Sequence, residues 1–147
     1  MKQKKWSKTK AIIILLILIL PSVFQIPKIL ATAPTVITTP QQLNNIRNNT
    51  SGSYILGKDI NLAYDTTNAN GLFYNGGDGW KPIPAFEGIL DGNGYKIIGL
   101  YCNNGSSGGL FSSIHGGTVK NLGIVDCNIS VKGQAQEAGG ITSSLSR

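Results

Sequence analysis

Short apolar runs alternate with glycine- and asparagine-rich segments through the second half of this chain. Residues 85–114 show the pattern most clearly, with apolar residues at positions 90, 95, 97, 98, 100, 110, 111 and 114. Four Asn-Gly pairs follow residue 69, and both residue types tolerate the positive φ of tight corners. The pattern predicts short strands joined by corners, as in one coil of a β-solenoid. Its corner and motif residues are Asp91, Gly92, Asn93, Gly94, Gly109, Leu110 and Phe111.

Two pairs of similar segments indicate a weak internal repeat. GLYC at 99–102 is similar to NLGI at 121–124, which aligns Leu100 with Leu122. GGLFSSI at 108–114 is similar to GGITSSL at 139–145, which aligns Ile114 with Leu145. Spacings of about 20–30 residues suit one turn of a solenoid. Because the second spacing is wider than the first, we predict a larger loop within or near residues 132–138.

A short amphipathic helix is predicted over residues 38–49. Thr39 is placed to cap it, a proline follows at the first helical position, and Gln42 completes a Thr-x-x-Gln capping box. Leu43 and Ile46 share one face of this helix. The first coil of a solenoid leaves its edge and apolar interior uncovered, so we predict that these two residues plug that end.

The segments on either side of residue 63 differ in character. Residues 53–62 are predicted to form two short strands with inward-facing side chains at Tyr54, Leu56, Ile60 and Leu62. Residues 63–79 contain few aliphatic side chains and are predicted to be the longest loop, an insertion that projects from the coil. Prolines at 82 and 84 exclude a regular central strand in the segment that follows.

Residues 1–33 have the features of a secretory signal peptide. A basic segment is followed by an unbroken apolar run at 11–20, and Ala31-Thr32-Ala33 supplies small residues for a signal peptidase. The apolar run is too short to span a bilayer core, which needs roughly 20 residues. Cleavage after Ala31 is an alternative because a proline follows Ala33, and an uncleaved signal anchor is another.

The predicted organisation follows from these segments. Residues 1–33 are the signal peptide, residues 34–52 are a cap that contains the short helix, and residues 53–147 form β-solenoid coils. We expect an exported protein that meets the membrane only through its signal peptide. The chain ends directly after a strand-like segment, which we interpret as truncation of a longer surface protein.

The distribution of charge argues against a nucleic-acid partner. The net charge is +6, but six of the 13 basic residues lie in the first 28 positions, where there is no acidic residue. The remainder carries seven basic and seven acidic residues. The predicted coils therefore have no excess of positive charge with which to bind phosphates.

Several motifs are similar to those of one known family. They are Phe86-x-Gly88-x-Leu90-Asp91-Gly92-Asn93-Gly94-x-x-Ile97, Gly99-Leu100-Tyr101, Gly109-Leu110-Phe111-x-x-Ile114 and Val119-x-Asn121-Leu122. Together with a matching lead-in (Leu43-x-x-Ile46, Tyr54-x-Leu56, Lys58-Asp59-Ile60-Asn61-Leu62 and Trp80-x-Pro82-Ile83), they resemble bacterial surface proteins built from GLUG-type repeats. The resemblance covers about residues 36–145. The copy at 139–145 departs from the motif, because Thr142 follows Gly140-Ile141.

This resemblance implies a fold and two classes of function. The fold is all-β, a right-handed parallel β-helix, here of about three coils. The first class is a non-catalytic surface module that binds a host or cell-wall glycan or a protein, as in adhesin-like proteins. The second is the N-terminal scaffold of a secreted metallopeptidase or polysaccharide-degrading enzyme whose active site lies beyond residue 147. We favour the first class.

The residues give little support to catalysis within the chain. His115 is the only histidine, so the His-Glu-x-x-His zinc motif is absent, and no Gly-x-Ser-x-Gly elbow occurs. Stacked coils could gather Asp59, Asp91 and Asp126, but we interpret each as a turn aspartate that bonds its own backbone. The Asp91 corner also lacks the distal glutamate of an EF-hand. We expect no catalytic residue, no cofactor and no metal.

Two further features are candidates for binding or crosslinking. The aromatic residues of the 63–80 segment lie among Asn, Asp and Gly, a combination that suits stacking on sugar rings: Tyr64, Phe73, Tyr74 and Trp80. The alternative, which we prefer, is that these rings pack over the coil. Cys102 and Cys127 can form a disulfide if adjacent coils align them, but the alignment of Leu100 with Leu122 puts Cys102 beside Ile124.

Overall fold

The computed structural model describes residues 32–105, 107–132 and 137–146. The predicted signal peptide up to residue 31, and most of the predicted loop near 132–138, lie outside these described residues. Within the part of the chain that is described, no helix is long and apolar enough to cross a membrane.

The described chain consists mostly of strands of two to five residues, with little helix. In order, they are β1 (Thr35–Ile37), β2 (Ser53–Leu56), β3 (Ile60–Asn61), β4 (Ile89–Asp91), β5 (Lys96–Ile98), β6 (Tyr101–Asn104), β7 (Ser107–Gly108), β8 (Phe111–His115), β9 (Thr118–Lys120), β10 (Gly123–Val125), β11 (Asn128–Val131), β12 (Glu137–Ala138) and β13 (Thr142–Ser146). The short strands agree with the many Asn and Gly corners in the sequence.

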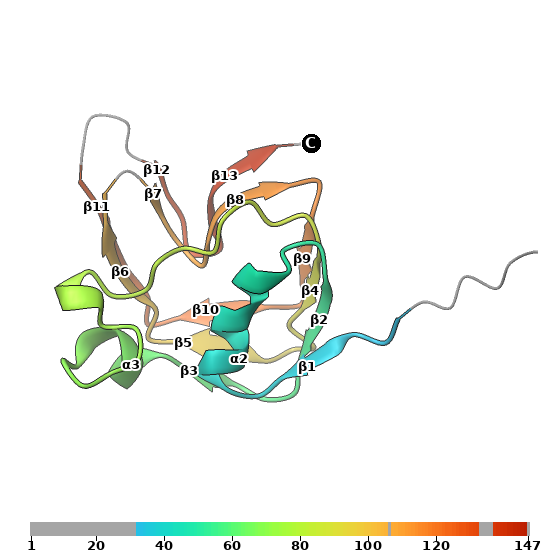
Figure 1. The fold of residues 1–147 in the computed structure, drawn as a ribbon, viewed down its shortest axis with the longest axis horizontal. Coiled ribbons are helices and arrows are strands. Elements are labelled where there is room, and N and C mark those ends of the chain that lie inside the picture. Colours follow the sequence, from blue (N-terminus) through green and yellow to red (C-terminus); the bar gives the residue numbers. More distant parts are fainter. Residues whose placement is uncertain (1–31, 106, 133–136, 147) are drawn as a thin grey trace, which may run out of the picture. The chain divides into compact units, whose positions relative to one another are not determined.

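Each of these strands pairs in parallel with a strand from an earlier or later part of the chain. The strands β1, β2, β4 and β9 form one sheet in that order, and β3, β5 and β10 form another. Three two-stranded sheets pair β6 with β11, β7 with β12, and β8 with β13. Figure 1 shows β5 beside β10 and β6 beside β11. The strands β4 to β8 therefore pair with β9 to β13 in chain order.

The register corrects one of the two predicted alignments. Phe111 pairs with Thr142 and Ile114 with Leu145, which confirms the alignment of GGLFSSI with GGITSSL. In contrast, Ile97 pairs with Ile124, so the spacing between β5 and β10 is wider than the one predicted. The similarity of GLYC to NLGI is therefore coincidental, and Leu100 does not pair with Leu122.

The core is one cluster of buried apolar side chains that lines the inner side of the strands. Phe86 stacks on Phe111 with ring centroids 4.5 Å apart, and isolated parallel bridges join Ile83 to Phe111 and Phe86 to Ile114. As predicted, the segment with the two prolines forms no regular strand. The four residues predicted to point inward from 53–62 are all buried: Tyr54, Leu56, Ile60 and Leu62.

The predicted helix is present but short. It comprises α2 (Pro40–Asn44), followed directly by a 3₁₀ helix, η2 (Asn45–Asn48). The capping box forms as predicted, because Thr39 Oγ1 accepts from the Gln42 backbone N–H at 3.2 Å and the Gln42 side chain accepts from the Thr39 N–H at 3.1 Å. Leu43 and Ile46 are fully buried and belong to the same cluster as the strand residues.

The predicted loop at 63–79 contains two short helices, and two of its side chains are buried against the strands, so it does not simply project from them. The helices are α3 (Ala63–Thr67) and the 3₁₀ helix η3 (Asn75–Gly77). Thr66 is fully buried, and its hydroxyl donates to the carbonyls of Leu62 (2.8 Å) and Gly99 (3.3 Å). Phe73 is also buried. The polar composition of residues 63–79 gave no indication of this packing, because it depends on only two side chains, those of Thr66 and Phe73.

Candidate functional site

Two of the four candidate ligand-binding aromatics lie in the interior. Trp80 is fully buried and Phe73 nearly so, and their rings meet edge to face with centroids 5.2 Å apart. The Trp80 indole N–H also donates to the Leu110 carbonyl at 3.1 Å. These two rings are therefore removed from the candidate set because a sugar cannot reach their faces. Tyr64 is 61% exposed and Tyr74 is half-buried.

The structure does not join the two cysteines. Cys102 is buried and lies opposite Ile129 in the β6–β11 register, whereas Cys127 is exposed and precedes β11. The disulfide alternative is therefore wrong for this structure, because the register aligns Cys102 with a residue that comes after Cys127.

The three aspartates that stacking could have gathered lie next to three different strands. Asp91 ends β4 beside Lys120 of β9. Asp59 precedes β3, and its carboxylate accepts from the Lys96 backbone N–H at 2.8 Å. Asp126 follows β10 at a left-handed corner with φ 51°. Among the described residues, no group of three His, Cys, Asp or Glu side chains is arranged to hold a metal ion.

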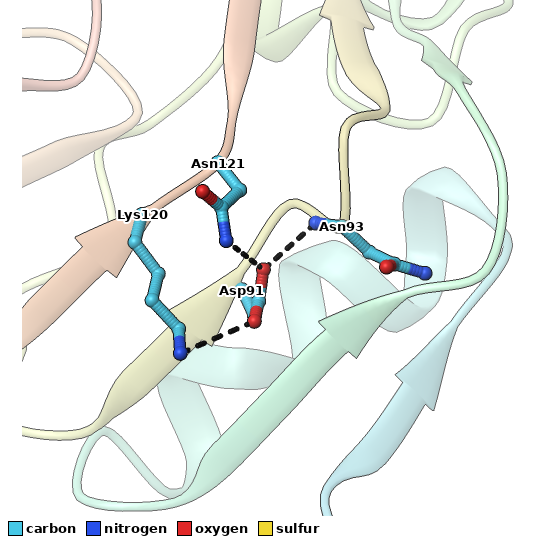
Figure 2. Close-up of polar contacts among 4 residues, drawn as sticks. All are labelled: Asp91, Asn93, Lys120 and Asn121. Carbon is cyan, nitrogen blue, oxygen red and sulfur yellow. Dashed lines mark hydrogen bonds and ion pairs between the residues drawn. The ribbon is translucent and has the colours of Figure 1, made fainter.

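Asp91 organises the corner between β4 and β5 (Figure 2). Its Oδ1 accepts from the Asn93 backbone N–H at 2.9 Å, as predicted for a turn aspartate, and from the Asn121 side-chain amide at 3.1 Å. Its Oδ2 forms an ion pair with Lys120 Nζ at 3.3 Å. Asn93 adopts a positive φ of 51°. We call the segments β4–β8 and β9–β13, which pair strand for strand, two passes of the chain. The Asp91 carboxylate therefore links its own turn in the first pass to the neighbouring second pass.

The contribution of the Asp91 carboxylate to the stability of the fold should depend on pH. The Asn93 N–H, and then the Asn121 amide, hold the pKa of Asp91 below its ordinary value of 3.8. A lowered folded-state pKa stabilises the fold above the ordinary value, and that contribution is lost as pH falls through the lowered pKa. We expect Asp91→Asn to melt below wild type at pH 7, and the difference to narrow as pH falls below the ordinary value of 3.8 and through the lowered pKa.

Thermal unfolding followed by circular dichroism between pH 7 and pH 2 measures this effect. The matched control is Asp78→Asn, because the Asp78 side chain is exposed and makes no hydrogen bond or ion pair among the described residues. A constant difference between Asp91→Asn and wild type across this pH range would contradict the assignment.

A second polar site lies between the helical cap and the 71–81 segment. This hollow, which we call the cap hollow, has a volume of about 380 Å³. Its lining combines two cations, three amides and two apolar side chains: Gln41, Asn44, Arg47, Leu72, Phe73, Asn75 and Lys81. No acidic side chain is among the residues that line it.

Arg47 connects the cap to the rest of the fold at this hollow. Its Nε donates to Asn44 Oδ1 at 2.9 Å and to the Asn44 carbonyl at 3.2 Å, and its Nη2 donates to the Lys81 carbonyl at 2.9 Å. Its guanidinium carbon lies 5.8 Å from the centre of the Trp80 ring. Burial lowers the pKa of Arg47. All its hydrogen-bond acceptors are neutral, so the positive charge has no carboxylate partner among the described residues.

The cap hollow was not predicted from the sequence, although its lining includes residues of the 63–80 segment that was a candidate binding surface. One sequence feature could have indicated the cap hollow. Arg47 is a basic residue that directly follows the buried Ile46, on a helix whose apolar face packs on the core. That signal is weak, because the partner of Arg47 is a backbone carbonyl distant in the sequence, that of Lys81.

His115 and its neighbouring serines do not form a hydrogen-bonded set within the described residues. His115 is exposed at the end of β8. The Ser112 hydroxyl approaches the Ile83 carbonyl at 3.4 Å, and the Ser143 hydroxyl donates to the Ser112 carbonyl at 2.5 Å. These bonds join neighbouring passes of the chain.

Comparison with known proteins yields two relatives of much greater length. The chain is 36% identical over 118 residues to a "Putative Gly-rich membrane protein" of Evansella cellulosilytica, a match that covers 74% of this chain and 13% of that protein. It is 36% identical over 100 residues to "Halomucin" of Haloquadratum walsbyi, covering 63% of this chain and 1% of that protein. No family model matches the chain. No solved structure matches it either.

Proposed function

We propose that this chain is a non-catalytic module of a secreted or cell-surface protein, built as a right-handed parallel β-helix, and that it serves adhesion by binding a glycan or a protein. The observation that carries the proposal is the pairing of β4 to β8 with β9 to β13, strand for strand and always in parallel. A chain that repeats five pairings in order behaves as stacked coils, which are stabilised mainly by contacts between neighbours.

Stacked coils suit a long surface protein because further coils extend the same core without changing it. Strands β9 to β13 carry apolar residues that a further coil would cover. Val119, Ile124 and Ile129 pack on the core but remain only partly buried, and Leu145 is 70% exposed. The two relatives are many times longer than this chain, and the name of one describes a membrane protein.

Exposure at the cell surface tests the location. The full chain with a C-terminal epitope tag is expressed in a bacterial host, and intact cells and medium are probed with antibody and protease. We expect the tag in the medium or in a protease-sensitive form on intact cells. The matched control lacks residues 2–33 and should keep the tag inside. A full chain whose tag stays protected within intact cells would contradict the proposal.

A further inference from the structure

We propose that the cap hollow binds an acidic saccharide, with its carboxylate between Arg47 and Lys81. This inference deepens the proposed function, because it names the ligand class that an adhesive surface module would take. It rests on the charge of the hollow, on its available hydrogen-bonding groups and on its size.

The positive charge of the hollow favours binding of an anion. Arg47 is half-buried, Lys81 lines the same hollow, and no acidic side chain lines it. The ion pair between Lys120 and Asp91 is the single one among the described residues, so neither cation of the hollow has a charged partner there. A partly desolvated charge without a counter-charge is unfavourable. A ligand carboxylate would supply that counter-charge, and an arginine can bind it with two parallel hydrogen bonds.

The amides of the hollow offer both donors and acceptors. Gln41 Nε2 donates to Asn45 Oδ1 at 2.9 Å, and Asn75 Nδ2 donates to the carbonyls of Phe73 and Gly79. Both side chains thus keep their carbonyl oxygens for a ligand. Asn44 uses its oxygen on Arg47 and keeps its amide nitrogen. A mixed set of this kind matches sugar hydroxyls, which both donate and accept.

Size and apolar surface favour a saccharide over an inorganic anion. A volume of about 380 Å³ falls in the range of small-molecule sites and far exceeds the volume of a sulfate ion. Leu72, which is 66% exposed, adds apolar surface for the carbon–hydrogen face of a sugar ring, and the small exposed part of Phe73 lines the same hollow. The hollow is also preformed, because Asn75 is held by two backbone carbonyls.

Trp80 provides a direct readout of binding. The chain has two tryptophans, so Trp6→Phe in the full chain leaves Trp80 as the only indole fluorophore. Because the Arg47 guanidinium lies 5.8 Å from its ring centre, a ligand carboxylate at Arg47 should change Trp80 emission. Titration with tri-galacturonic acid, followed by fluorescence and calorimetry, is expected to show saturable binding that weakens as salt is added.

Matched ligands and variants define the site. The methyl ester of the same trisaccharide removes the charge and should bind about tenfold more weakly. Lys81→Gln should weaken tri-galacturonate binding about two- to fivefold, as expected for an exposed charge. Lys58→Gln, an exposed lysine outside the hollow, should leave binding unchanged.

Four outcomes would overturn the inference. They are no heat and no fluorescence change, equal binding of the ester, equal weakening by Lys58→Gln and Lys81→Gln, and tighter binding of sulfate or of an acidic peptide than of the saccharide. A chain that reaches the cell surface but fails these titrations overturns the ligand class alone. A chain retained inside cells overturns the proposed function.

Discussion

Replacing Trp80 with alanine is expected to lower the free energy of unfolding by about 3–5 kcal/mol. The indole is fully buried between three parts of the chain: Phe73 of the insertion meets its ring, Arg47 of the cap lies over it, and Leu110 of the next pass accepts its N–H. Its loss leaves a cavity, which is destabilising, and removes one of the two hydrogen bonds that the Leu110 carbonyl accepts, since the Ile83 N–H still donates to that carbonyl at 2.9 Å. We expect the melting temperature to fall by roughly 10–20 °C.

Two variants separate the structural role of Trp80 from a ligand-binding role. Trp80→Phe keeps a ring but removes the N–H that donates to Leu110, so it should melt between wild type and Trp80→Ala. Tyr64→Ala, at an aromatic residue that is 61% exposed, should change stability by at most about 0.5 kcal/mol. If Trp80→Ala melts close to wild type, then the buried position of Trp80 is wrong and its face becomes available to a ligand.

Features encoded within a short stretch of sequence could be predicted. The capping box needs only Thr39 and Gln42, and the burial of Leu43 and Ile46 follows from their spacing. The alignment of GGLFSSI with GGITSSL could also be read, because the same small side chains recur in both passes. These features depend either on residues close together in the sequence or on two segments with similar sequences. They can therefore be predicted without knowing which unlike, distant residues come into contact.

The register of β5 with β10 was missed because chemically different residues serve the same corner. Gly99 and Asp126 follow paired positions of these two strands, and both adopt a left-handed φ, of 67° and 51°. Aspartate tolerates this conformation less easily than glycine, but it is among the residues that adopt it. Sequence similarity cannot align a glycine with an aspartate, although the backbone treats them alike.

The candidate site depended even more on distant contacts. Aromatic residues among polar ones left two interpretations open, sugar binding or packing. The preferred one, packing, holds for Phe73 and Trp80, which are buried, and Trp80 donates to Leu110, thirty residues later in the sequence. The role of Arg47 could not be predicted, because its environment is set by Lys81 and Trp80, which are distant in the sequence. Local composition identified the right part of the chain but not the residues that line the hollow.

Replacing Gly92 with alanine is the second change expected to have a large effect. Gly92 lies in the Asp91 corner, where its N–H donates to the Lys120 carbonyl at 2.8 Å. A Cβ atom there would lie 2.5 Å from Leu122 Cα and would also overlap the Asn121 carbonyl oxygen. Both are backbone atoms of the next pass, and the pairing of β4 with β9 and of β5 with β10 fixes them in place. The two passes must therefore separate locally.

We expect Gly92→Ala to cost about 2–4 kcal/mol, measured by urea unfolding, which is a large share of the stability of a typical domain. Gly94 in the same corner has open space around its Cβ position but a φ of 81°, so Gly94→Ala should cost about 1–2 kcal/mol through conformation alone. Gly105 has open space and no positive φ, so Gly105→Ala should be neutral within about 0.5 kcal/mol. If Gly92→Ala costs no more than Gly105→Ala, the close approach of these two passes is wrong, and with it the stacking on which the β-helix proposal rests.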